Sequence, residues 1–259
     1  MSPKPPETTF ILAFTLAFTV KYTKQLVGQV DNGTASTNLL ENTTQSREFF
    51  MASKTAERIL LVSLELFNQQ GEANITSVDI ANELDMSPGN LYYHFKGKEE
   101  ITAALFSMYQ DRMKRVLFSP GENGLVIKDF FYFLYLTFET SHLFRFLYRN
   151  PSDLVAKYPY IEKGFKNLIK NKEKGFNQIL NDFIKQGSLA VKREELVHLI
   201  ELISMVLTQG LNYYVMKGDD IDDDDIIYRG LASVFFALSP YLDIEEQQKN
   251  DLQLAIANG

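Results

Sequence analysis

The segment 76–98, TSVDIANELDMSPGNLYYHFKGK, constrains the fold more than any other part of this chain. It predicts two short helices joined by a tight turn. The first helix is expected over 77–84, where apolar residues recur at helical spacing. The second opens at Ser87, a good N-cap residue, and Pro88 follows at the first helical position, where its missing N–H costs nothing. Such a pair is typical of a helix-turn-helix, whose second helix enters the major groove by its N-terminal residues.

The second helix of this pair is expected to turn Leu91 and Phe95 inward. The remaining face is rich in tyrosine, histidine and asparagine, which is unusual for a plain solvated surface. Tyrosine hydroxyls and lysines reach phosphates, and asparagine can pair with a base edge. The sequence therefore predicts a helix face suited to groove recognition.

Two longer segments resemble a known family. The run SPGNLYYHFKGKEEI resembles the recognition helix and following helix start of the TetR family of bacterial transcriptional regulators. The run TAERILLVSLELFNQQGEANITSVDIANELDMS resembles that family's first two helices, so the likeness covers residues 53–117. The family usually has glycine at the turn, where this chain has Asp85, a residue that tolerates a positive φ better than most.

The resemblance implies an all-α fold with an N-terminal helix-turn-helix DNA-binding head and a C-terminal helical ligand-binding and dimerisation domain. It implies a repressor that works as a homodimer on a palindromic operator in double-stranded DNA and responds to a largely apolar or aromatic small molecule. It also implies a cytoplasmic protein without a cofactor or a membrane. The residues it assigns to DNA are Thr76 and Ser77 for phosphates, Pro88, Gly89 and Asn90 at the base-facing helix start, and Tyr92, Tyr93, His94 and Lys98 for mixed contacts. Tyr93 has an alternative role, packing on the head.

Charge and composition limit the other functional classes. The net charge of −7 excludes a nonspecific polyanion binder, although residues 87–98 contain two lysines, one histidine and no acid. The absence of cysteine excludes disulfides, thiolate metal sites and cysteine nucleophiles. No metal-ligand spacing, glycine-rich phosphate loop or arguable Ser-His-Asp order is present, so we expect no enzyme. The alternatives are a helical small-molecule-binding or scaffold protein without DNA binding, and an enzyme that uses an apolar cavity.

Residues 1–50 differ from the rest and are interpreted as a leader, either disordered or outside the native protein. The apolar run 10–20 is too short to span a bilayer, which takes roughly 20 residues. Met51 resembles a natural start, so we expect it to be the initiator. Two alternatives remain for residues 1–50. They are a membrane anchor or export signal, or a genuine but poorly ordered extension. The head is then expected over 51–97 and the helical effector-binding and dimerisation domain over 98–259.

The body pattern is helical throughout. Helices are expected over 53–70, 98–117, 126–148, 159–186, 193–216 and 226–238, with a short helix or turn before Pro159 and a weak tail helix over 244–257. In the helix expected over 98–117, the fourth in the chain, Ile101, Leu105 and Met108 are expected to face inward. Dimerisation is expected through 193–216 and 226–238, where Gly210 and Gly230 permit close approach and Leu231 and Val234 lie on an apolar stripe.

Candidate ligand contacts lie in the aromatic run 130–148. His142 and Arg145 are three residues apart, so they are expected to share a helix face and to orient a polar or anionic group, with Phe138 as an apolar contact. A purely structural role is the alternative for each. The acidic run 219–225 lacks the spacing of a calcium loop and is interpreted as charge at a helix N-terminus.

Overall fold

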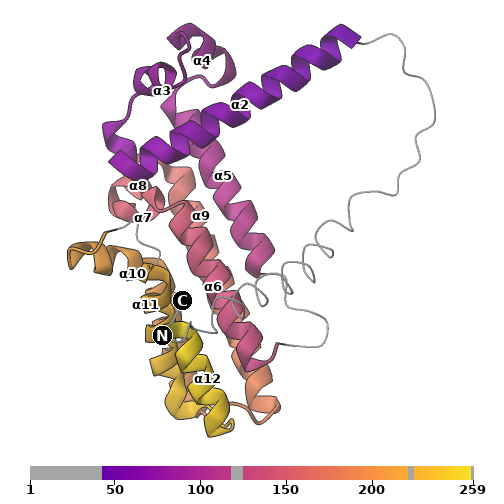
Figure 1. Cartoon of the computed structure of the whole chain (residues 1–259), viewed down its shortest axis with the longest axis vertical. Coiled ribbons are helices and arrows are strands. Elements are labelled where there is room, and N and C mark those ends of the chain that lie inside the picture. The colour runs from indigo at the N-terminus through magenta and orange to yellow at the C-terminus, as the bar shows by residue number, and fades with distance from the viewer. Residues whose placement is uncertain (1–42, 118–124, 221–224, 258–259) are drawn as a thin grey trace, which may run out of the picture. The chain divides into compact units, whose positions relative to one another are not determined.

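The computed structural model describes residues 43–117, 125–220 and 225–257, with side chains from residue 54 onward, and the protein is built from helices (Figure 1). The elements are α2 (Thr43–Gln70), the 3-10 turn η1 (Glu72–Asn74), α3 (Ser77–Glu83), α4 (Pro88–His94), α5 (Lys98–Leu117), α6 (Ile127–Leu143), α7 (Phe146–Arg149), α8 (Pro151–Lys157), α9 (Pro159–Lys185), α10 (Arg193–Met216), α11 (Asp225–Leu238), the 3-10 turn η2 (Ser239–Tyr241) and α12 (Glu246–Ala257). The described residues contain no strand, only an isolated bridge between Leu189 and Leu242. The expected all-α fold is confirmed.

The chain divides into two compact units, Met1–Glu48 with Gly259, and Phe49–Asn258. Helix α2 begins at Thr43, ten residues before the start expected for it. The rest of the segment interpreted as a leader, residues 1–42, lies outside the described residues. The expected boundary between head and body falls at the short connection between α4 and α5 and stays a prediction.

The helix expected over 126–148 is interrupted, which is a correction to the sequence pattern. Helix α6 ends at Leu143, Phe144 leaves the helical conformation, and α7 begins at Phe146. The side chain of Asn68, from α2, donates to the Leu143 carbonyl at 2.9 Å and accepts from the Phe146 N–H at 3.0 Å. These two bonds satisfy backbone groups that a continuous helix would have paired internally.

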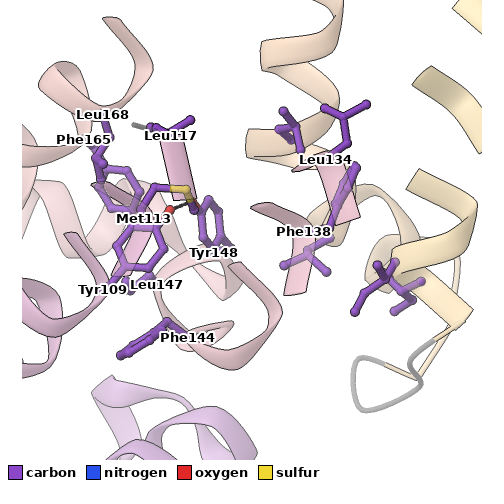
Figure 2. Packing of buried hydrophobic residues seen from close by; sticks show 14 of the residues in the cluster. Tyr109, Met113, Leu117, Leu134, Phe138, Phe144, Leu147, Tyr148, Phe165 and Leu168 are labelled. Carbon is purple, nitrogen blue, oxygen red and sulfur yellow. Dashed lines mark hydrogen bonds between the residues drawn. The ribbon is translucent and has the colours of Figure 1, made fainter. Parts of the chain in front are cut away.

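The core of the body is strongly aromatic. Figure 2 shows Tyr109 and Tyr148 with their hydroxyls hydrogen-bonded to each other, close to Met113 and Phe165. Burial and the neighbouring Tyr148 hydroxyl raise the pKa of Tyr109, so the Tyr109 hydroxyl stays neutral. Met108, expected to face inward, is exposed, and Tyr109 takes the inward position instead. One residue of shift rotates a helical side chain by roughly 100°, which is enough to exchange the two.

Helix α11 approaches α6 closely at Gly230. A Cβ built on Gly230 would lie 2.6 Å from two ring atoms of Phe138. Leu231 and Val234, expected to serve a partner subunit as well as the core, are buried within the protomer. Phe235 likewise packs on Phe131 of α6, with ring centroids 5.7 Å apart. The close approach that Gly230 permits is therefore an intrachain contact between α11 and α6.

We expect Gly230→Ala to lower the free energy of unfolding by about 1–3 kcal/mol, because the added methyl overpacks the contact with Phe138. Gly175→Ala is the matched control, since a Cβ there meets nothing within 4 Å and the helix gains about 0.5–1 kcal/mol. Chemical denaturation of both variants measures the difference. Adding Phe138→Leu to Gly230→Ala should restore part of the loss, and equal stability of the two glycine variants would contradict the packing argument.

Candidate nucleic-acid interface

Helix α3 begins with a reciprocal cap. The Thr76 hydroxyl accepts from the Asp79 N–H at 3.2 Å, and the Asp79 carboxylate accepts from the Thr76 N–H at 2.8 Å. Thr76 is thus the N-cap of α3. The same carboxylate accepts the Thr76 hydroxyl proton at 2.6 Å, and these hydrogen bonds lower the pKa of Asp79. This box fixes the start of α3 from four consecutive residues alone.

The turn into α4 needs one unusual backbone conformation. Asp85 has φ of 53°, in the left-handed region, as expected for a residue standing where the family has glycine. The Met86 N–H then donates to the Ala81 carbonyl at 3.0 Å. Ser87 caps α4 by accepting from the Asn90 N–H at 3.2 Å, and Pro88 occupies the first helical turn. The helix pair and its capping residues agree with the sequence prediction.

The outer face of α4 is polar and aromatic. Leu91 and Phe95 are buried, whereas Tyr92 is 61% exposed and Tyr93 is 81% exposed. Gly89 and Asn90 are also exposed, and His94 is half-buried with its ring edge-on to Tyr93 at 5.3 Å. This exposure argues against the alternative that Tyr93 packs on the head. Val78 of α3 is half exposed as well, so it belongs to the outer surface despite its apolar type.

Lys98 lies apart from this face. Its ammonium is 3.0 Å from the Glu72 carboxylate and donates to the Glu72 carbonyl at 2.8 Å. The side chain is only 19% exposed. Phosphate contact by Lys98 would require it to leave both oxygens, so the structure favours a structural role at the start of α5.

Glu72 is the centre of a buried charge cluster that the sequence did not reveal. Besides Lys98, its carboxylate accepts from the Tyr158 hydroxyl at 2.6 Å and from the Lys157 ammonium at 2.9 Å. Glu72 directly follows the glycine that ends a helix, a position typical of an ordinary solvated residue. Its three partners lie 26 to 86 positions away in the sequence, so no local pattern indicates them. The cluster joins η1 of the head to α5 and to the end of α8.

Charge pairing decides the protonation of this cluster. Burial alone would raise the pKa of Glu72, but the hydrogen bonds from Tyr158, Lys157 and Lys98 outweigh it and lower that pKa. Burial alone would lower the pKa of Lys157, but hydrogen bonds with Tyr158 and Glu72 raise it to about 12. Glu72 and Lys157 are therefore both ionised at neutral pH.

A second connection ties the end of α2 to α7. Besides the Asn68 bonds to Leu143 and Phe146, the Arg149 guanidinium donates to the Gln69 carbonyl at 2.9 Å and to the Asn68 carbonyl at 3.3 Å. These carbonyls belong to the last turn of α2, where intrahelical partners are missing. The head is thus held to the body through polar contacts at its α2 and η1 end.

The three candidate ligand residues do not form the group that their spacing predicted. The break at Phe144 separates His142, in the last turn of α6, from Arg145, so the two do not share a continuous helix face. Arg145 instead donates to the His142 carbonyl through its own N–H at 3.1 Å. Phe138 is buried against Gly230. Their contact with a ligand stays a prediction.

Other classes of site find little support in the described ranges. No group of three or more His, Cys, Asp and Glu there could hold a metal ion. No helix there is long and apolar enough to cross a membrane. Of the acidic run, Asp219 pairs with Arg229 of α11 at 2.7 Å, while 221–224 lie outside the described residues.

Comparison with known proteins gives two family matches. Residues 59–105 match the model described as bacterial regulatory proteins, tetR family, and residues 108–249 match the model described as bacterial transcriptional repressor. A curated relative, an uncharacterised HTH-type transcriptional regulator in the dhlA 5' region of Xanthobacter autotrophicus, is 39% identical over 56 residues. That alignment spans 22% of this chain and 28% of the relative's length.

Solved structures share the fold over most of their length. A TetR-family transcriptional regulator from Marinobacter aquaeolei VT8 aligns with a TM-score of 0.69 and 25% identity, covering 79% of this chain and 98% of that one. The ketosteroid transcriptional regulator KstR2 of Mycobacterium tuberculosis aligns with a TM-score of 0.54 and 18% identity, covering 73% and 96%. The helical body below the helix-turn-helix is thus similar to those of known regulators.

Proposed function

Because the chain belongs to the TetR family of bacterial transcriptional regulators, we propose that it is a ligand-responsive repressor that binds a palindromic operator as a homodimer. Membership makes it a DNA-binding transcriptional regulator with a ligand-binding domain. We place its action in the cytoplasm, where bacterial DNA is found, and assign it no catalytic role.

The outer face of α4 is the observation that carries the proposal. A capped helix start with exposed Gly89 and Asn90, followed by exposed Tyr92 and Tyr93, offers hydrogen-bond donors and flat rings to a groove. Pro88 and His94 complete this face, and Ser77 at the start of α3 supplies a hydroxyl for a phosphate. A phosphate contact by Thr76 is proposed with its hydroxyl proton turned away from the Asp79 carboxylate, to which it donates here. We assign Lys98 to the Glu72 cluster rather than to DNA contact.

Dimerisation is proposed through an exposed apolar stripe on α10 and α11. Leu202, Met205, Tyr213 and Met216 lie on one side of α10, and Phe236 is exposed on the adjacent α11. A Cβ on Gly210, on the same helix, would meet only Val206, at 3.9 Å, which leaves room for a partner helix. Pairing these helices across a two-fold axis makes a four-helix bundle, a self-complementary interface.

The regulatory step is proposed as a shift between two arrangements of the heads. Half-sites one turn apart lie roughly 34–36 Å from each other, so a small change in head spacing weakens operator binding. Helix α5 starts at the Glu72 cluster and packs against α6 and α9, so it links the head to the proposed effector-binding helices. An effector shifts this equilibrium only if it binds the two arrangements with different affinity.

Asn90→Ala and Tyr92→Ala test the DNA-binding proposal. Each should weaken binding to an operator, obtained by selection from random DNA, by roughly tenfold or more, because a base or phosphate contact contributes about 1–3 kcal/mol. Both side chains are exposed, so melting temperatures should stay unchanged. Asn171→Ala, at an exposed asparagine of α9, is the matched control.

Failure of the selection to enrich any sequence would favour the alternative of a helical binding or scaffold protein without DNA binding. Unchanged operator affinity in both α4 variants would contradict the assignment of this face.

A further inference from the structure

The connection between α4 and α5 is short and held by hydrogen bonds. Only residues 95–97 separate the two helices. Phe95 is buried, and its N–H donates to the Leu91 carbonyl at 2.9 Å. The Lys96 N–H donates to the Glu100 carboxylate, in the first turn of α5, at 2.6 Å. Because the connection is bonded to both helices, a tilt of α5 on the body is expected to turn α4 as well.

Helix α5 meets α9 at a glycine. The two helices pack against each other (Figure 1), and the ring of Phe106 from α5 lies over Gly164 of α9. A Cβ built on Gly164 would lie within 2.5 Å of two ring atoms of Phe106, closer than real Cβ atoms approach a neighbour. Both residues are buried. Any side chain larger than that of glycine would therefore displace the ring or one of the two helices.

The Phe106 ring also has aromatic neighbours in α9. Its centroid lies 5.5 Å from that of Phe165 and 6.4 Å from that of Tyr160. The Tyr160 hydroxyl donates to the Glu99 carbonyl in the first turn of α5, at 3.4 Å. Phe106 is about 12 Å along α5 from the start of that helix, at 1.5 Å per residue. The packing of Phe106 over Gly164, called here the Gly164 contact, thus fixes α5 in the half that is nearer to α4.

We propose that Gly164 is a positioning residue for operator recognition. Through the Gly164 contact it sets the orientation of α5 on the body, and with it the half-site spacing that the dimer accepts. The inference rests on the proposed function and adds a determinant of operator geometry to the α4 face, which contacts the bases. In a two-fold dimer the same displacement of α5 occurs in both subunits, so both heads move. Half-sites one turn apart lie roughly 34–36 Å from each other, so small head movements favour a different spacing.

Gly164→Ala tests the Gly164 contact directly. The full chain is assayed on the operator obtained by selection and on versions with one base pair added to or removed from its centre. The ratios of affinity among these three DNAs should change by roughly fivefold or more, the factor that corresponds to a typical overpacking strain. Affinity for a single half-site should stay within about twofold of the parent, because the α4 face is untouched and distant effects are nearly independent.

A second variant approaches the same contact from α5. Phe106→Leu removes the ring atoms that lie over Gly164 and should weaken the spacing preference, because α5 is then held less firmly. Combining Phe106→Leu with Gly164→Ala gives the added methyl the room that the ring occupied. The double variant should therefore regain the spacing preference of the parent.

Two control variants on α9 separate position from stability. Gly175→Ala adds a methyl that meets nothing within 4 Å. Phe183→Leu removes part of a buried ring that packs on Phe130 of α6, with centroids 5.6 Å apart. Both should keep the spacing preference of the parent, although Phe183→Leu should lower the melting temperature.

The outcomes distinguish this inference from the proposed function. Parent-like affinity ratios in both Gly164→Ala and Phe106→Leu would overturn the inference alone, and so would an equal change of the ratios in Phe183→Leu. If Gly164→Ala does not fold, Phe106→Leu and the double variant decide by the same ratios. A parent that binds all three DNAs equally, or for which selection enriches no operator, would refute the proposed dimeric repressor and the inference with it.

Discussion

Replacing Met205 with glutamate is expected to produce a folded monomer that no longer binds a two-half-site operator tightly. Met205 is 57% exposed and lies on the apolar stripe of α10. A carboxylate there would be buried against the partner subunit without a counter-charge, which opposes association. Losing the second head should weaken binding by roughly 100-fold or more, the range by which two linked sites exceed one.

Val197→Glu is the matched control for Met205→Glu. Val197 is also on α10 and 53% exposed, but lies on another side of the helix from the stripe. It should leave sedimentation and operator affinity unchanged. Charges at Leu231 or Val234 would not serve this purpose, because both are buried in the protomer and their loss would unfold it. A Met205→Glu protein that remains dimeric at micromolar concentration would contradict the proposed interface.

Glu72→Ala is expected to lower the free energy of unfolding by about 3 kcal/mol, because it leaves Lys98 and Lys157 without their shared carboxylate. The figure is at the low end for a broken buried ion pair, since Lys157 is half exposed and solvent screens it. Glu83→Ala, at an exposed glutamate of the same head, is the control. A loss no larger than that of Glu83→Ala would contradict the role of the cluster.

The lowered pKa of Glu72 gives this prediction a pH dependence. A carboxyl whose folded-state pKa is depressed stabilises the fold above its unfolded pKa, and the contribution disappears as the pH falls through the folded value. The stability difference between the parent and Glu72→Gln should therefore be constant around neutral pH and shrink below the ordinary value of about 4.5. A difference that already fades near pH 6 would contradict the lowered pKa.

The sequence by itself determined the helix-turn-helix, because that information is local. The cap at Ser87, the left-handed turn at Asp85 and the inward Leu91 and Phe95 depend on residues a few positions apart. Helical periodicity likewise located the body helices, and α10 begins and ends at the residues expected for it. Local hydrogen bonds and the burial of one helix face depend on residues close together in the sequence, so the spacing of residue types can predict them.

Only the tertiary structure decided the features that join distant segments. Asn68 breaks the helix after Leu143 from 75 positions away, and Glu72 gathers Lys98, Lys157 and Tyr158 around a buried carboxylate. Packing also decided that Leu231 is buried within the protomer while Met205 stays exposed, and that Lys172 alone among the lysines of its helix is enclosed. A helical pattern shows which side of a helix is apolar but not which element covers it, because burial depends on contacts between residues far apart in the chain.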